Sequence, residues 1–151
     1  MKIHTGSEPW NHAAALYVRM NVFVLERTIA IEDEFDDHDE ADRVYVVIYS
    51  DKGQPIATGR FQTIDDTTMR PGRIATLKAF RGQHLGAKLI EALEKYGKAH
   101  GYTHSLVHSE MTAKGFYEHQ GYHISSNAYE EDGVPAITLT KTLLQTVPHH
   151  I

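Results

Sequence analysis

The sequence predicts a single-domain α/β fold, because one stretch of it follows the order strand, turn, helix, strand. Residues 74–77 suit a half-buried strand, and Arg81–Gly82 supplies a turn. Over residues 83–100, apolar side chains recur at spacings of three or four, which predicts an amphipathic helix that Gly101 would end. Residues 103–107 then suit a short strand. The stretch therefore predicts a βαβ unit with a parallel pair of strands.

The residues before this unit predict an edge strand and one long helix. Residues 1–5 suit a short strand. Ser7 is a good N-cap and Pro9 falls in the first turn, so a helix is expected to begin there. Apolar residues at helical spacing continue from that point to about Glu26, where the helix would end.

A hairpin connects this helix to the βαβ unit. The apolar runs at 43–50 and 55–64 flank Asp51-Lys52-Gly53, whose composition is typical of a hairpin turn. Residues 65–72 are polar and predict a turn-rich connection.

The chain closes with a shorter helix and two more strands. The helix is expected to end at Gly121, with strands over 122–125 and 134–143. No repeat or linker is visible, so one domain is predicted to span residues 1–151.

Composition argues against several classes of function. The net charge is −5 and no basic stripe is present, so nucleic acid is a poor partner. No apolar run approaches the ~18 residues of a membrane span, so no membrane partner is expected. The absence of cysteine removes thiolate metal sites and a cysteine nucleophile, and it suits a cytoplasmic protein. The 11 histidines are scattered, with His149–His150 in a solvated tail, so no metal is expected.

The strand–turn–helix order is also a phosphate-binding arrangement. The first N–H groups of a helix have no partner within it, and its positive dipole end favours an anion. Gly82 and Gly86 leave room for a bulky ligand near the backbone. Neither the G-x-x-x-x-G-K-[ST] loop nor the G-x-G-x-x-G dinucleotide fingerprint is present. The plainer alternative is an ordinary helix N-terminus preceded by a glycine turn.

Residues 81–87, Arg-Gly-Gln-His-Leu-Gly-Ala, resemble the pyrophosphate loop [QR]-x-x-G-x-[GA] of the GNAT superfamily, the acyl-CoA-dependent N-acyltransferases. His84 stands where the family usually has its first glycine, so its Cβ would narrow the loop while its ring could donate to a phosphate. The resemblance implies that acetyl-CoA binds here as a co-substrate. The acetyl-CoA-binding residues that it implies are Ala75, Thr76, Leu77, Arg81, Gly82, Gln83, His84, Leu85, Gly86 and Ala87.

Three further segments resemble the ElaA-like branch of this family, in the family's order. Residues 19–26 resemble the first-helix element R-x-x-V-F-V-x-E-Q, with Arg27 where that branch has glutamine. Phe116–Tyr117 followed by Gly121–Tyr122 resembles A-x-x-F-Y-x-x-x-G-F. Residues 129–137 resemble the E-D-G-I-P-H hairpin. The joint resemblance implies a GNAT-like mixed, splayed β-sheet with helices on both faces.

The family transfers an acetyl group directly from acetyl-CoA to a primary amine, here expected on a small molecule or a peptide. The reaction needs a neutral amine, a polarised carbonyl and a proton for the departing thiolate. Backbone N–H groups of residues 75–77 would hold pantetheine and polarise the carbonyl. The resemblance makes Tyr117 the expected general acid. His108 is the expected base because histidine titrates near neutral pH. Glu110, which stands where many members have asparagine, and Glu26 are rival bases, and a water chain is a further option.

Each assignment has a plainer alternative. Tyr117 would be a core tyrosine with a satisfied hydroxyl, His108 an inert histidine at a strand end, and Glu26 part of a buried helix. For the whole chain, the alternative is a non-catalytic acyl-CoA-binding regulatory module, which needs the phosphate loop but neither acid nor base. A third hypothesis is a protein that binds a metal through histidine and carboxylate side chains. A homodimer is compatible with the sequence, which does not determine the oligomeric state.

Two acidic segments bear on the acceptor. Residues 32–40 carry seven acidic side chains in nine positions. The glycine and final glutamate of an EF-hand are missing, and a charge run of this kind is usually a solvated loop. The alternative is that this run and Glu130–Asp132 line a substrate entrance, which would favour a cationic amine.

Overall fold

The computed structural model describes residues 1–36, 39 and 43–143. They divide into two compact units. The first unit comprises Met1–Gln62 and Pro71–Leu93, and the second comprises Thr63–Arg70 and the residues from Glu94 onward. Strands β3 and β4 and helix α3 contribute residues to both units, so each unit is described by itself below.

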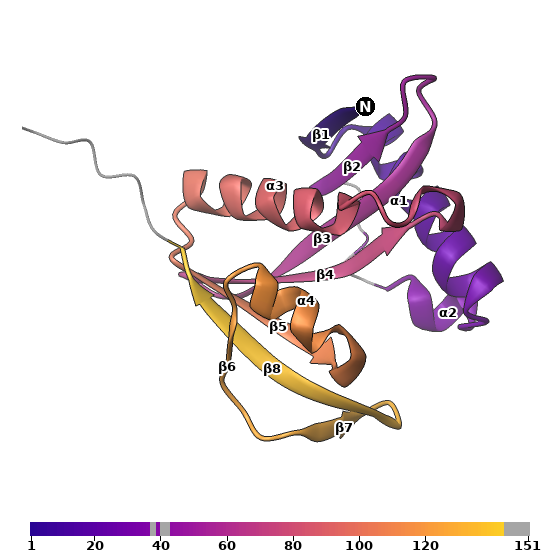
Figure 1. Ribbon diagram of the computed structural model, residues 1–151. Coiled ribbons are helices and arrows are strands. Elements are labelled where there is room, and N and C mark those ends of the chain that lie inside the picture. The colour runs from indigo at the N-terminus through magenta and orange to yellow at the C-terminus, as the bar shows by residue number, and fades with distance from the viewer. Residues whose placement is uncertain (37–38, 40–42, 144–151) are drawn as a thin grey trace, which may run out of the picture. The chain divides into compact units, whose positions relative to one another are not determined.

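The first unit holds the N-terminal strands and helices (Figure 1). Its elements are β1 (Lys2–Gly6), α1 (Pro9–Arg19), the π-helix η1 (Met20–Glu26), α2 (Ile31–Glu34), β2 (Tyr45–Tyr49), most of β3 (Pro55–Asp65), the end of β4 (Thr68–Thr76), the 3₁₀ turn η3 (Lys78–Phe80) and the start of α3 (Leu85–Ala99).

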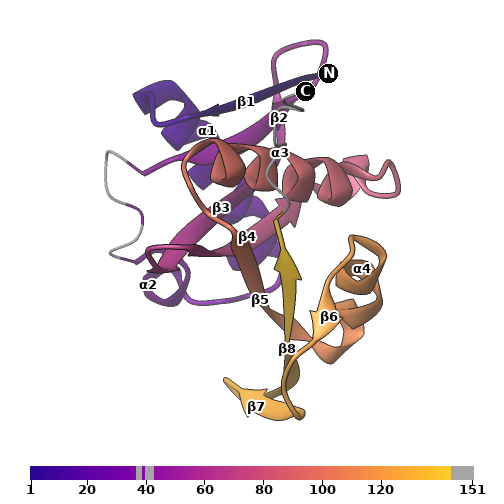
Figure 2. The same cartoon turned by 90° about the vertical axis from the view of Figure 1, so that its left-hand side faces the viewer.

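The second unit is organised around β5 and β8, which lie side by side with β6 and β7 along β8 (Figure 2). Its complete elements are β5 (His104–Glu110), the 3₁₀ turn η4 (Met111–Ala113), α4 (Lys114–His119), β6 (His123–Ile124), β7 (Tyr129–Glu131) and β8 (Val134–Thr142).

The strand order β1-β2-β3-β4-β5-β8-β6, with β7 on β8, makes a mixed sheet of eight strands. Strands β4 and β5 are parallel, whereas β1, β2 and β3 pair antiparallel, as do β8 and its partners. The parallel register covers Thr68 and Met69, opposite His104 and Ser105, while β5 continues along β8 to Glu110. The predicted mixed, splayed α/β sheet is confirmed.

Helices α1 and α3 cover opposite faces of the sheet in the first unit (Figure 1). Tyr45 and Val47 of β2 pack with alanines of α1 in one buried cluster. Val46 alternates with them and pairs with Gly59 of β3, so it belongs to the other face. A Cβ at Gly59 would lie 2.7 Å from Ile74 and 3.2 Å from Leu93 of α3. Glycine is therefore needed at residue 59 for close packing.

Three predicted boundaries are corrected. The N-cap of α1 is Glu8 rather than Ser7, with Pro9 in the first turn. The long helix widens into a π-helix after Arg19, which its apolar spacing did not reveal. Most of the segment predicted as turn-rich, 65–72, is strand, because β4 already begins at Thr68. Met69 alternates with half-buried neighbours in the strand, a pattern that the polar composition concealed.

Candidate active site

The loop before α3 in the first unit has an open helix N-terminus. Strand β4 ends at Thr76, and η3 leads into residues 81–84 and then into the helix at Leu85. The N–H of Lys88 donates to the carbonyl of His84 at 3.3 Å, the first bond of the helix. The N–H groups of Leu85, Gly86 and Ala87 precede that bond and have no acceptor within the helix. The helix begins two residues later than the sequence predicts, and these three N–H groups are its open end.

Two residues of this loop adopt the left-handed backbone region that favours glycine. Gly82 has φ of +83°, and His84 has φ of +59°. A Cβ at Gly82 would meet no atom within 4 Å, so there is room for a side chain. Glycine is favoured there because of the positive φ angle. His84 keeps the left-handed region at the family's glycine position, at a cost of about 1 kcal/mol for a residue with a Cβ. The loop therefore holds a histidine in a backbone conformation that glycine would adopt with less strain.

The end of β4 offers one backbone donor rather than three. The N–H of Leu77 donates to the carbonyl of Ile56 in β3 at 2.8 Å, so it is already used within the sheet. Alternation along the strand turns the N–H of Ala75 to the same edge and that of Thr76 to the opposite edge. The expectation that Leu77 supplies a free donor is wrong. Thr76 is the residue of this segment whose N–H faces away from β3.

Arg81 and Glu26 form a bidentate ion pair within the first unit. The two guanidinium–carboxylate distances are 2.6 and 2.7 Å, and Nε of Arg81 donates to the carbonyl of Thr76 at 3.0 Å. The hydrogen bonds from Arg81 lower the pKa of Glu26. A carboxylate held in this way is a weaker base, which argues against Glu26 as the proton acceptor. Glu26 is the last residue of η1 and is exposed, whereas Val22 and Phe23 of the same helix are buried.

Tyr117 of α4 is in the second unit, with its ring held by aromatic neighbours. Its ring meets those of Phe116 and Tyr122 edge-on, at centroid distances of 5.0 and 5.8 Å. Burial raises the pKa of Tyr117 above its ordinary value of 10.0. No hydrogen bond of its hydroxyl to another described residue is seen, in contrast to Tyr122, whose hydroxyl donates to Glu94 at 3.0 Å and lies 2.7 Å from Ser105. The satisfied core tyrosine is therefore Tyr122.

His108 and Glu110 lie two residues apart on β5, so they share one face of that strand. The burial pattern agrees. Val107, before His108, and Ser109, between the two residues, are buried, whereas His108 and Glu110 are more exposed. Nδ1 of His108 lies 3.6 Å from a carboxylate oxygen of Glu131 in β7. Burial lowers the pKa of His108 below its ordinary value of 6.5, so a neutral imidazole is favoured. The second unit thus brings two of the predicted site residues together.

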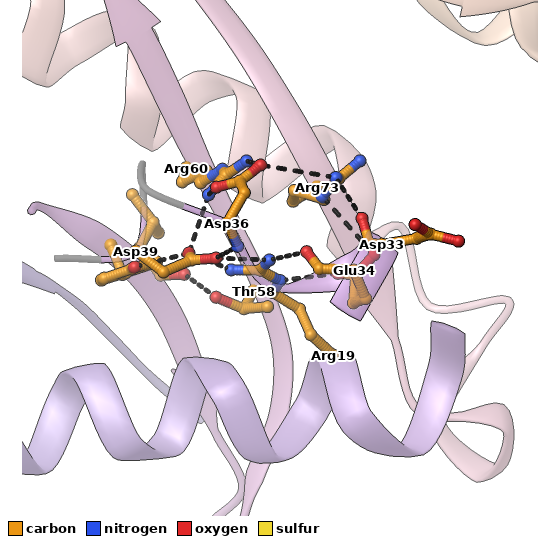
Figure 3. Close-up of polar contacts among 10 residues, drawn as sticks. Arg19, Asp33, Glu34, Asp36, Asp39, Thr58, Arg60 and Arg73 are labelled. Carbon is orange, nitrogen blue, oxygen red and sulfur yellow. Dashed lines mark hydrogen bonds and ion pairs between the residues drawn. The ribbon is translucent and has the colours of Figure 1, made fainter. Parts of the chain in front are cut away.

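The acidic run is largely internal to the first unit. Arg19 of α1 is fully buried and donates from Nε to the carboxylate of Glu34 at 2.8 Å, and from a terminal nitrogen to that of Asp39 at 3.0 Å (Figure 3). Glu34 is itself only 1% exposed. Tyr45 also donates to Asp39, at 2.8 Å. The expectation of a solvated loop is wrong for Glu34 and Asp39.

Two arginines from the sheet complete this network. Arg60 of β3 binds Asp39 at 2.7 Å and Asp36 at 3.0 Å (Figure 3). Arg73 of β4 lies 3.5 Å from Glu34 and 3.7 Å from Asp36. Three guanidinium groups therefore neutralise three carboxylates of the run. Within the described part of the run, Glu32, Asp33 and Asp36 are exposed, and Asp36 is the one of the three that the arginines pair; residues 37, 38 and 40 lie outside the described residues.

Sequence reasoning missed this network, although one signal pointed to it. Arg19 continues the buried stripe of α1 that runs through Asn11, Ala15 and Val18. An arginine on a buried stripe needs a carboxylate or acceptor, because an unpaired buried charge is very costly. The pairing of Glu26 with Arg81 has no such signal, since 55 residues separate the two.

Asp39→Asn is expected to lower the free energy of unfolding at pH 7 by about 1–3 kcal/mol, because two buried arginines lose a charged acceptor. Burial opposes ionisation of Asp39, but hydrogen bonds from Arg19, the Asp36 N–H and Tyr45 outweigh it and hold its pKa well below 3.8. The ionised Asp39 therefore contributes its full stabilisation above about pH 4, and this stabilisation is lost as the pH falls toward the pKa of Asp39 in the folded protein. Urea unfolding from pH 7 to pH 2 measures it.

The variant should show a flatter decline of stability with acid than the wild-type protein, and Asp33→Asn, at an exposed position, serves as the control. Parallel curves for Asp39→Asn and the wild-type protein would contradict a role of the Asp39 charge in stability.

Residues 1–36, 39 and 43–143 show neither a metal-binding cluster nor a membrane-spanning helix. No group of three or more His, Asp or Glu side chains among them could hold a metal ion. No helix among them is long and apolar enough to cross a bilayer.

Comparisons with known proteins identify the family of the chain. The family model described as "Acetyltransferase (GNAT) domain" matches residues 19–143. An acetyltransferase of Streptococcus pyogenes, itself uncharacterised, is 42% identical over 113 residues, which cover 75% of this chain and 77% of that protein. A crystal structure from Lactobacillus plantarum, named only provisionally as an N-acetyltransferase, matches with a TM-score of 0.90 and 41% identity over 95% of this chain and 98% of that one.

Escherichia coli ElaA shares the fold, with a TM-score of 0.79 over 93% of this chain and 98% of its own, at 21% identity. The match to the family model covers most of the sequence and includes the loop, β5 and α4 described above. The chain belongs to the GNAT family of acyl-CoA-dependent acetyltransferases.

Proposed function

We propose that this protein is an N-acetyltransferase that moves an acetyl group from acetyl-CoA directly to a primary amine. The observation that supports it most is the loop over residues 81–87, whose left-handed Gly82 and His84 precede the open N-terminus of α3. The N–H groups of Leu85, Gly86 and Ala87 suit the pyrophosphate, because helix N-termini favour anions. Gln83 lies in the same loop and is exposed, so it is available to the co-substrate.

The end of β4 would orient the acyl end of the co-substrate. In this proposal the N–H of Thr76 polarises the thioester carbonyl, since its neighbours on either side donate toward β3. Ala75 and Leu77 line the strand on both sides of it. Ala75 is buried against Val18, Val22 and Phe23, with Leu77 packed beside that cluster. This packing would hold the donor in place.

The proton transfers would belong to residues of the second unit. A protonated amine first loses a proton to Nε2 of His108, and the neutral nitrogen then forms its bond to the carbonyl carbon while the carbon–sulfur bond breaks. Tyr117 gives its hydroxyl proton to the departing thiolate, and the surplus proton on the new amide nitrogen restores the tyrosine. One proton per turnover thus leaves through His108. Glu110, on the same face of β5, is the alternative acceptor.

The acceptor in this proposal is a small or peptide-borne amine with positive charge. In the network of Figure 3, arginines neutralise the charges of Glu34, Asp36 and Asp39. These three carboxylates therefore add little to the negative potential of the acidic run. The remaining support is the β7–β8 hairpin, where Glu130 and Asp132 are exposed. Carboxylates of this kind raise the local concentration of an ammonium group.

A panel of amines tests both the activity and the acceptor class. Release of CoA is read with a thiol reagent, to which the protein contributes no background because it has no cysteine. We expect kcat/KM to be greater for polyamines and lysine peptides than for neutral-bodied amines at low salt, and to fall as salt screens the charges. Glu130→Gln with Asp132→Asn should reduce this preference, whereas Glu32→Gln with Asp33→Asn is the control.

Equal kcat/KM for cationic and neutral amines would contradict the acceptor class. Binding of acetyl-CoA without CoA release from any amine would favour the second candidate, a regulatory module that binds acyl-CoA. That candidate is supported by the loop alone and requires nothing of Tyr117 or His108.

A further inference from the structure

We propose that Glu131 is a positioning residue that orients His108 for proton transfer, with Arg70 as the opposing charge. The inference rests on the proposed base and adds two residues to it. All three side chains belong to the second unit, on β5, β7 and the start of β4.

The carboxylate of Glu131 bridges the other two groups. One of its oxygens lies 3.6 Å from Nδ1 of His108, and the other lies 3.9 Å from a terminal nitrogen of Arg70. His108 and Arg70 thus face different oxygens of one carboxylate. The side chains are partly exposed, at 32% for His108, 43% for Glu131 and 29% for Arg70, so a substrate proton can reach the ring without unfolding the hairpin.

The hairpin that carries Glu131 is held in register against β5. Its turn uses two left-handed residues, Asp132 at φ of +52° and Gly133 at +78°, which is the geometry of a tight two-residue hairpin. Tyr129 meets the ring of His108 edge-on, at a centroid distance of 6.3 Å and 80°. The Tyr129 hydroxyl lies 2.9 Å from that of Thr138, the residue that pairs with His108 across β5 and β8.

This placement specifies which nitrogen of His108 works as the base. A carboxylate beside Nδ1 favours the tautomer with its proton on Nδ1, which leaves the lone pair of Nε2 for the substrate. Burial and the charge of Arg70 lower the pKa of His108, and Glu131 raises it. The charged groups facing the ring are thus Arg70 from β4 and Glu131 from β7, and they act in opposite directions.

The test compares three variants by two measurements. The variants are Glu131→Gln, Arg70→Gln and the control Asp66→Asn, which removes an exposed carboxylate of the same unit that has no assigned role. NMR titration of the His108 ring, assigned with His108→Gln, gives its pKa without any substrate. The acidic limb of the pH profile of kcat/KM gives the pKa of the working base.

We expect the two variants to shift the His108 pKa and the acidic limb in opposite directions. Glu131→Gln should move both to lower pH, and Arg70→Gln should move both to higher pH, while Asp66→Asn leaves them near the wild-type position. Glu131→Gln should also lower kcat by about 10-fold, part of the ~10²-fold that a general base contributes. The KM for acetyl-CoA should not change. Glu131→Asp, which keeps the charge, should recover part of the loss.

A double variant separates this inference from the proposed function. In a His108→Gln background, Glu131→Gln should have no further effect on kcat, because it acts through the histidine. If His108→Gln slows turnover while Glu131→Gln changes neither the pKa nor kcat, Glu131 has no positioning role and the base assignment stands. If His108→Gln leaves turnover and the pH profile unchanged, both the base and the positioning residue are wrong.

Discussion

Replacing Tyr117 by phenylalanine is expected to lower kcat by about 10²-fold, the usual scale for a lost general acid. The substitution removes only the hydroxyl. The edge-on packing of the ring against Phe116 and Tyr122 remains, so the fold should be retained. Burial raises the pKa of Tyr117, which keeps the hydroxyl protonated and able to donate at neutral pH. Steady-state kinetics with saturating acetyl-CoA measure the loss, and calorimetry should find the acetyl-CoA affinity little changed.

Tyr122→Phe is the matched control for this prediction. It also removes one hydroxyl from the aromatic cluster, but that hydroxyl is used by Glu94 and Ser105. The control should lose stability because buried hydrogen bonds are lost, while kcat stays near the wild-type value. Wild-type turnover in Tyr117→Phe would exclude Tyr117 as the acid.

Replacing Gly86 by tryptophan is expected to abolish detectable binding of acetyl-CoA. Gly86 is the second residue of α3, and its N–H belongs to the open first turn that would receive the pyrophosphate. A large side chain there would occupy the space of the phosphates. Isothermal titration calorimetry with acetyl-CoA measures the affinity, and circular dichroism checks the fold.

Glu91→Trp is the control for Gly86, because it places the same side chain on an exposed position of the same helix beyond its first turn. It should bind acetyl-CoA with the wild-type affinity. Unchanged affinity in Gly86→Trp would remove the pyrophosphate from this loop.

The parts of the fold that depend on local chemistry could be predicted from sequence. The hairpin at residues 51–53 and the helix after the loop follow from turn residues and apolar spacing, the closing hairpin at 132–133 follows from the family resemblance, and each is present. The loop itself could be recognised because its spacing is short and contiguous. The left-handed backbone of His84 could not be predicted, because a histidine in a sequence does not reveal its φ angle.

The electrostatic pairings could not be predicted, because they join residues that are distant in sequence. Arg19 meets Glu34 and Asp39 only once α1 has packed on the sheet, and opposite charges in a sequence do not state which pair will form. The acidic run therefore looked like a substrate entrance or a solvated loop. The register of β7 with β8 likewise decides that Glu131, and not Glu130, faces His108.

A labelled acetyl group shows directly whether the protein transfers acetyl from acetyl-CoA to an amine. Wild-type protein is incubated with acetyl-CoA carrying an isotopic label in its acetyl group and with a cationic amine, and the products are measured by mass spectrometry and by free thiol. We expect labelled N-acetyl amine and free CoA to appear in equal amounts, at rates that rise with the protein concentration. Acetyl-CoA that binds to the protein and is recovered intact with every amine would contradict this expectation.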